Sequence, residues 1–187
     1  MFFDSYTIVM TGIGGQGLIT LLEILGRALV NEGYKVATSE THGLSQRGGK
    51  VVCFLRFGTK MSAPIPIVGS ADIIIAFEKN CIADVLKFTK PDKSTILVIS
   101  TYEEGLSDRT LFNSIKDFSS RIYFIPINSI SNKLNFDLKK TNMLLLGYIL
   151  RFLPLSEKSI EQTLIQRFSG DKLAINVEIL KEGIKLE

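Results

Sequence analysis

The chain has 187 residues, 22 basic and 19 acidic side chains, a net charge of +3 and 45% hydrophobic residues, and we expect residues 1–187 to form a single domain. The small charge and scattered Lys and Arg argue against a nucleic-acid partner, and the longest apolar runs are too short to span a membrane. The two cysteines have no C-x-x-C spacing, which predicts neither a disulfide framework nor an iron–sulfur site. Together with a start that lacks a basic leader, this pattern predicts a cytoplasmic protein.

The first predicted elements are a strand at residues 6–10 and a helix whose apolar side chains recur at helical spacing over residues 18–29. The glycines between them fit the pattern G-x-G-x-x-G in its required context, after a strand and before a helix. Such glycines permit positive φ and close backbone approach, and a helix N-terminus favours an anion. We therefore expect a binding turn formed by Gly12, Gly14, Gly15, Gln16 and Gly17.

A second strand is predicted at residues 34–39, parallel to the first and joined to it by a right-handed crossover. Glu40 follows this strand, about twenty residues beyond the glycines, where a nucleotide-binding fold places its ribose-binding acid. Spacing alone leaves two interpretations open. Glu40 and the glycines form an NAD site, or Glu40 is a loop residue at a coincidental position.

Residues 41–49 read THGLSQRGG, an unusually dense polar and glycine-rich segment before a strong strand at 50–57. The segment holds the only histidine, His42, without metal-ligand spacing or an adjacent nucleophile, and a structural histidine is the alternative. Arg47 has the planar fork that binds phosphate or carboxylate, although a solvated or ion-paired arginine is commoner. The segment predicts a surface presented to a partner or substrate, formed by Glu40, His42, Ser45, Gln46, Arg47, Gly48 and Gly49.

A nearly continuous apolar run at residues 71–77 predicts a strand buried on both faces. Glu78 stands at its carboxyl end, the edge at which open α/β sheets bind ligands, and helix capping or ion pairing is its alternative role. The pattern then predicts, in order, a helix through 82–88, a strand at 95–100, a helix at 111–118 and a strand at 121–127.

The C-terminal part turns helical from about Lys139, with predicted helices at 143–153, 156–168 and 173–184. Ser156 with Glu157 in the following turn is a helix-start signal. The whole pattern predicts an α/β class: a Rossmann-like three-layer domain with a mostly parallel sheet and a helical C-terminal end.

The glycine turn, the segment at 41–49 and the buried strand that ends in Phe77-Glu78 together resemble the gamma-type subunits of the 2-oxoacid:ferredoxin oxidoreductases. The greatest likeness is to the small (beta) subunit of indolepyruvate:ferredoxin oxidoreductase. Its most specific part is the block His-Gly-x-Ser-Gln-Arg-Gly-Gly, and later residues agree with it: Asn142, Gly147, Pro154, Phe168, Asn176 and Gly183.

This resemblance implies a subunit that supports coenzyme A-dependent oxidative decarboxylation of indolepyruvate or a related aryl 2-oxoacid. It implies that thiamine diphosphate, Mg²⁺ and iron–sulfur clusters lie in partner subunits, that coenzyme A is the co-substrate and that ferredoxin takes the electrons. The chain itself would hold no catalytic residue and no metal, and would need a larger thiamine diphosphate-binding subunit. Two alternatives stay open, a stand-alone NAD(P)-binding oxidoreductase domain and a non-catalytic assembly module that shares the fold.

Overall fold

The computed structural model describes residues 4–42, 49–60, 63–102 and 106–186. Within these residues six strands form one sheet in the order β2-β3-β1-β4-β5-β6. The strands are β1 (Tyr6–Ile13), β2 (Lys35–His42), β3 (Lys50–Gly58), β4 (Ile73–Ala76), β5 (Ile96–Thr101) and β6 (Arg121–Pro126). The α-helices are α1 (Leu18–Asn31), α2 (Leu106–Ile115), α3 (Ile127–Leu134), α4 (Thr141–Ile149), α5 (Glu157–Arg167) and α6 (Gly170–Lys185). Short 3₁₀ helices are η1 (Lys79–Asp84), η2 (Leu86–Phe88), η3 (Leu138–Lys140) and η4 (Leu150–Phe152).

The sheet is mostly parallel, because only β3 runs against its neighbours. The β1–α1–β2 unit exists and its two strands point the same way, as predicted. They are not neighbours, however, because β3 lies between them and pairs antiparallel with both. The direct β1–β2 pairing that is usual in a nucleotide-binding fold is therefore not formed between these two described strands.

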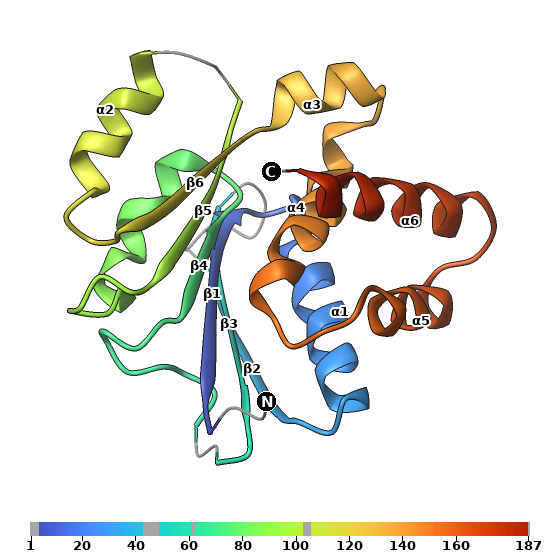
Figure 1. The fold of residues 1–187 in the computed structure, drawn as a ribbon, viewed down its shortest axis with the longest axis horizontal. Coiled ribbons are helices and arrows are strands. Elements are labelled where there is room, and N and C mark those ends of the chain that lie inside the picture. The colour runs from blue at the N-terminus through green and yellow to red at the C-terminus, as the bar shows by residue number, and fades with distance from the viewer. Residues whose placement is uncertain (1–3, 43–48, 61–62, 103–105, 187) are drawn as a thin grey trace.

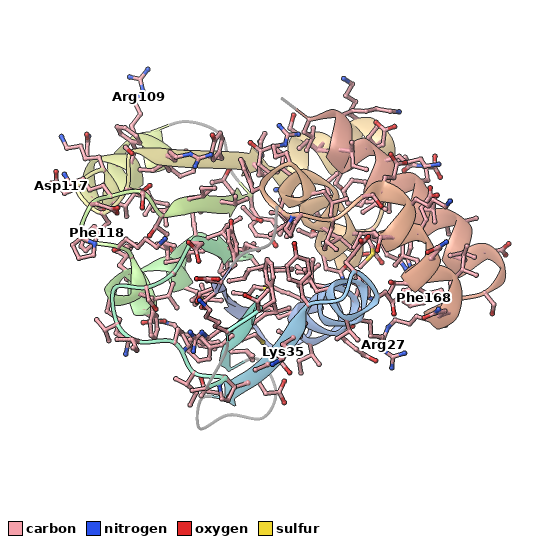
Figure 2. All side chains as sticks on the ribbon, turned by 60° about the horizontal axis from the view of Figure 1, so that its bottom comes forward. Arg27, Lys35, Arg109, Asp117, Phe118 and Phe168 are labelled. Carbon is pink, nitrogen blue, oxygen red and sulfur yellow. The ribbon has the colours of Figure 1, made fainter. Side chains whose placement is uncertain are left out.

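Helices cover both faces of the sheet and give the predicted three-layer architecture (Figure 1). One core lies under α1, α4, α5 and α6 and includes Ile8, Leu25 and Leu144. The other lies under η1, η2 and α2 and includes Val9 and Phe54. Figure 2 marks the two outer layers, with Arg27 and Phe168 on the α1 side and Arg109 and Asp117 on the α2 side.

The predicted helix through 82–88 is wrong in type, because the structure has two short 3₁₀ helices there. The apolar side chains explain the difference. Ile82, Val85 and Phe88 recur every three residues and all are buried, which matches the three residues per turn of a 3₁₀ helix. The predicted helix at 111–118 is displaced, since α2 starts earlier, within a polar stretch that apolar periodicity does not mark.

Local signals mark the end of α1 and the start of α5. α1 ends in a Schellman motif, in which the Gly33 amide donates to the Val30 carbonyl and the Tyr34 amide to the Leu29 carbonyl, both at 3.0 Å. The Ser156 hydroxyl accepts a hydrogen bond from the Ser159 amide at the start of α5, as predicted. Among the helices of the described ranges, none is both long and apolar enough to cross a membrane.

Candidate functional site

The candidate site lies at the edge of the sheet where β1 ends and α1 begins. Gly12 still belongs to β1 and pairs with Val51 of β3. A side chain at Gly12 has no room, because a Cβ would lie 2.6 Å from Gln16 Oε1 and 2.9 Å from Phe77 Cβ. Gly17 needs both properties of glycine, since its φ is +84° and a Cβ would lie 2.5 Å from Asn142 Nδ2. The glycines therefore serve close packing and the turn, as predicted.

Gly14 and Gly15 form the exposed tip of the turn. The Gly14 amide donates to the Gly49 carbonyl at 2.9 Å, so the turn meets the end of the segment that the sequence marked as a presented surface. Gly15 has a φ of +101°, and a Cβ built there would meet nothing within 4 Å. Among the described residues, the tip is therefore held by a hydrogen bond at Gly14 and uncrowded at Gly15.

Gln16 fixes the turn through its side-chain amide. Its Oε1 accepts a hydrogen bond from the Ile13 amide at 2.8 Å, and its Nε2 donates to the Tyr102 hydroxyl at 3.3 Å. The Tyr102 hydroxyl in turn donates to the Phe77 carbonyl at 3.4 Å. These bonds join the turn to the ends of the two neighbouring parallel strands, β4 and β5.

Glu40 does not lie where a ribose-binding acid would. It is an exposed residue inside β2, paired with Cys53, which pairs in turn with Met10. Glu40 is therefore level with the middle of β1 and separated from it by a whole strand, a span of about 10 Å at the usual strand spacing. The prediction that Glu40 follows the strand and opens a loop is wrong.

His42 ends β2, so the predicted loop starts later than expected. Ser45, Gln46, Arg47 and Gly48 lie outside the described residues, and their predicted role stays a prediction. Gly49 lies beside the glycine turn through the bond to Gly14.

Glu78 lies at the carboxyl end of β4, as predicted, directly before η1. Its side chain makes no capping hydrogen bond to that helix. The Glu78 charge acts on Tyr102, whose pKa is raised by burial first and by Glu78 second, and lowered by the hydrogen bond from Gln16. Tyr102 is therefore a neutral hydroxyl at ordinary pH, able to donate and accept.

Tyr102 and Asn128 also lie at this edge, although the sequence pattern did not predict them as site residues. The Asn128 side-chain amide donates to the Tyr102 carbonyl, which ties α3 to the same edge. The available signal was a polar aromatic residue at the end of an apolar strand. Asn142, which the family resemblance had named, also lies at this edge, because its side-chain amide donates to the Gly17 carbonyl at 3.5 Å.

Within the described residues, this edge offers backbone amides and hydroxyl groups as hydrogen-bonding partners. The first turn of α1 holds no acidic residue, and Gly17 supplies no capping side chain. Within the described ranges no three His, Cys, Asp or Glu residues gather as a metal site. Cys53 and Cys81 are buried, and burial is the main cause that raises the pKa of each thiol.

Comparison with known proteins adds a family to this geometry. The family model described as pyruvate ferredoxin/flavodoxin oxidoreductase matches residues 7–186. The indolepyruvate oxidoreductase subunit IorB of Thermococcus kodakarensis is 28% identical, with the alignment covering 97% of this chain and 95% of that protein.

Two solved structures share the fold. Pyruvate oxidoreductase subunit PORC of Thermotoga maritima superposes with a TM-score of 0.73 at 18% identity, over 96% of this chain and 95% of that one. The 2-oxoglutarate:ferredoxin oxidoreductase of Magnetococcus marinus, solved with 2-oxoglutarate, coenzyme A and succinyl-CoA, gives a TM-score of 0.76 at 19% identity. That match covers 97% of this chain but only 30% of the longer chain.

Proposed function

Since the chain belongs to the pyruvate ferredoxin/flavodoxin oxidoreductase family and is a subunit of a 2-oxoacid:ferredoxin oxidoreductase, we propose that it is the gamma-type subunit. The substrate of the proposed enzyme is indolepyruvate or a related aryl 2-oxoacid. The reaction would convert the 2-oxoacid and coenzyme A into an acyl-coenzyme A and carbon dioxide, with the electrons passing to ferredoxin. The observation that carries the proposal is the family match over residues 7–186, nearly the whole chain. The named relative IorB supports the aryl substrate.

The chemistry of the donor set argues that the cofactors lie elsewhere. The chain has two cysteines, Cys53 and Cys81, and they lie on different elements, β3 and η1. Iron–sulfur clusters of the common types need four thiolates. We therefore place thiamine diphosphate, Mg²⁺ and the clusters in a larger partner subunit. This chain would supply position and shape to the site rather than the reacting group.

The segment from Glu40 to Gly49 remains our proposal for the surface that faces the partner subunit near the entrance of its active site. Its link to the glycine turn through Gly14 and Gly49 supports one continuous surface at this edge. Arg47 would hold an anionic group, either of coenzyme A or of the partner, through its planar fork. His42 would orient groups by hydrogen bonding. The whole complex would work in the cytoplasm.

A stand-alone NAD(P)-binding function has a specific observation against it. Glu40 pairs with Cys53, which pairs with Met10 in the middle of β1, so β3 separates Glu40 from β1 and from the glycine turn at the end of β1. A ribose bound at the glycine turn would lie far from this carboxylate. We expect no NAD or NADP binding in calorimetric titrations of the chain. Micromolar binding that Gly14→Ala abolishes would restore that alternative.

Copurification and reconstitution test the proposed function. The tagged chain, expressed in its own host, should retain a larger thiamine diphosphate-dependent subunit. The complex should turn over indolepyruvate with coenzyme A and an electron acceptor, whereas the chain by itself should not. Turnover by the purified single chain, or a chain that retains no such subunit, would refute the proposal. The latter result would favour a non-catalytic assembly module.

A further inference from the structure

The tip of the glycine turn has no side chains of its own to hold its shape. Gly14 and Gly15 are exposed, Gly15 adopts a φ of +101°, and no atom of the described residues would lie within 4 Å of a Cβ on Gly15. Glycine loses more conformational entropy than other residues when its backbone is ordered. The shape of the tip must therefore be fixed by hydrogen bonds from residues around it.

Gln16 supplies these bonds with both ends of its side chain. Its carbonyl oxygen accepts from the Ile13 amide at 2.8 Å, while its own backbone amide donates to the Ile13 carbonyl at 3.2 Å. Because an amide N–H can only donate, the Gln16 oxygen must face Ile13. The Gln16 NH₂ group must then face Tyr102.

Tyr102 fixes the position of that NH₂ group. Its hydroxyl donates its one proton to the Phe77 carbonyl, so it must be the acceptor in its hydrogen bond with Gln16. Its carbonyl accepts from the Asn128 side-chain amide. The chain of bonds runs from α3 and the end of β5 to the underside of the exposed tip, and each donor in it has one acceptor.

We propose that Gln16 and Tyr102 are positioning residues, which hold the tip at Gly14–Gly15 in the conformation that fits the larger thiamine diphosphate-dependent subunit. The inference rests on the proposed function. A fixed surface loses less entropy on binding than a flexible one, so support under an exposed tip favours association. The Tyr102 ring packs against one apolar core, and Tyr102→Phe keeps that ring, so loss of the hydroxyl should affect partner binding more than folding.

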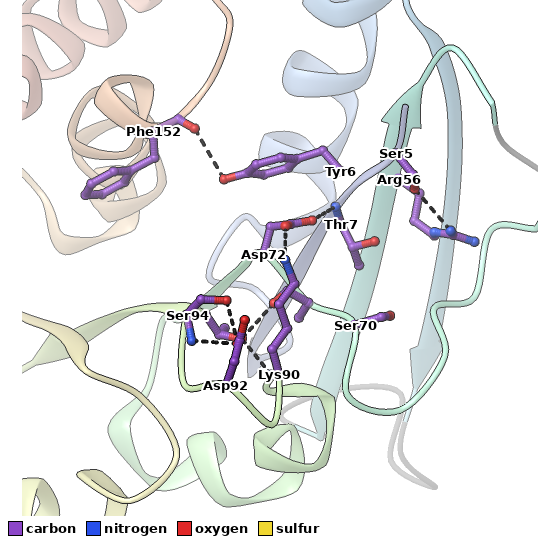
Figure 3. Close-up of polar contacts among 12 residues, drawn as sticks. Ser5, Tyr6, Thr7, Arg56, Ser70, Asp72, Lys90, Asp92, Ser94 and Phe152 are labelled. Carbon is purple, nitrogen blue, oxygen red and sulfur yellow. Dashed lines mark hydrogen bonds and ion pairs between the residues drawn. The ribbon is translucent and has the colours of Figure 1, made fainter. Parts of the chain in front are cut away.

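Tyr102→Phe removes one hydroxyl from the network, and Tyr6→Phe is its matched control. Tyr6 is also a mostly buried tyrosine whose hydroxyl donates to a backbone carbonyl, that of Phe152 at 3.3 Å, but it lies at the other end of β1 (Figure 3). Tyr102→Phe should weaken partner binding about three- to tenfold, the effect of one lost hydrogen bond. It should also speed hydrogen exchange of the Gly14 and Gly15 amides. Tyr6→Phe should change neither.

A double-mutant cycle asks whether Tyr102 acts through Gln16. In a Gln16→Leu background, Tyr102→Phe should cause no further loss of partner affinity, because the bond that transmits its effect is already gone. Gln16→Leu alone should weaken binding at least as much as Tyr102→Phe.

Wild-type affinity for the partner in the Tyr102→Phe variant would overturn this inference and leave the proposed function intact. So would a Tyr102→Phe effect that persists in full in the Gln16→Leu background. A wild-type chain that binds no thiamine diphosphate-dependent subunit would overturn the proposed function, and this inference with it.

Discussion

Gly147 of α4 and Gly183 of α6 lie against one another where the two helices cross. A Cβ on Gly147 would lie 2.1 Å from the Leu180 carbonyl oxygen, and a Cβ on Gly183 would lie 2.1 Å from the Leu144 carbonyl oxygen. The backbones of the two helices therefore touch at a distance that no other residue permits. Every residue of α4 is buried, so this crossing joins the C-terminal helices to the core.

Gly147→Ala and Gly183→Ala should each destabilise the domain, because the new methyl group meets backbone rather than a movable side chain. Overpacking of this kind costs about 1–3 kcal/mol, or roughly 2–12 °C in melting temperature for a domain of this size. Gly26→Ala in α1 is the control, because its Cβ would meet Val36 Cγ1 at an ordinary 3.8 Å. It should be neutral or stabilising, since alanine favours helix over glycine. Equal melting temperatures for the three variants would contradict this account.

The two positive-φ glycines of the turn should differ in their tolerance of alanine. Gly15→Ala meets open space and bears only the backbone strain, of order 1–3 kcal/mol. Gly17→Ala bears similar strain and also overlaps Asn142, with its Cβ 2.5 Å from Nδ2 and 2.9 Å from Cγ. Thermal unfolding should therefore rank Gly17→Ala below Gly15→Ala. The Gly17→Ala, Asn142→Ala double variant should recover part of the difference, and no recovery would show that overlap is not the cause.

The glycine turn was predictable because its function in the fold is local. Gly12, Gly14 and Gly17 occur in one short stretch that links a strand to a helix, and their spacing alone indicates a tight turn. Tyr102 was not predictable in the same way, because its partner Gln16 is 86 residues away. Their contact depends on the strand order β1-β4-β5, which no local pattern encodes. The insertion of β3 between β1 and β2 likewise follows from pairing across the sheet, and it displaced Glu40 from its predicted role.

Alkaline pH should destabilise the domain in part through Cys53. Burial, with a smaller contribution from the Glu40 charge, raises the pKa of this thiol from 9.0 to about 12. Between these pH values the folded state keeps a proton that the unfolded state loses. The contribution of the thiol to stability is therefore fully present below pH 9 and is lost as the pH rises toward 12. The group contributes at most about 1.4 kcal/mol per pH unit in that window. Denaturant titrations at several pH values should show that the free energy of unfolding falls less steeply with pH in Cys53→Ala than in the wild type.

Glu40→Gln provides the control for that measurement. It removes only the smaller cause of the shift and should keep most of the pH dependence of the wild type. Parallel stability curves for wild type and Cys53→Ala above pH 9 would show that the thiol does not titrate in this way.

Asp72 should stabilise the start of β1 through two different bonds. One carboxylate oxygen accepts from the Thr7 amide at 2.7 Å, and the other pairs with the Lys90 ammonium group (Figure 3). Asp72→Ala leaves the buried Thr7 amide without this acceptor and Lys90 without this charge, and it should lower the free energy of unfolding by about 2–3 kcal/mol. Asp72→Asn keeps an acceptor for Thr7 and should cost about half as much.

The exposed pair of Asp4 and Lys60 is the matched comparison for this ion pair, because both side chains are more than three-quarters exposed, at 76% and 79%. Asp4→Asn should leave stability unchanged within error, since solvent screens exposed pairs. If Asp72→Asn proves as costly as Asp72→Ala in denaturant titrations, the charge on Lys90 and not the Thr7 amide dominates. A Lys90→Met variant would then show the same loss, whereas our account expects Lys90→Met to cost less than Asp72→Ala because it leaves the Thr7 bond in place.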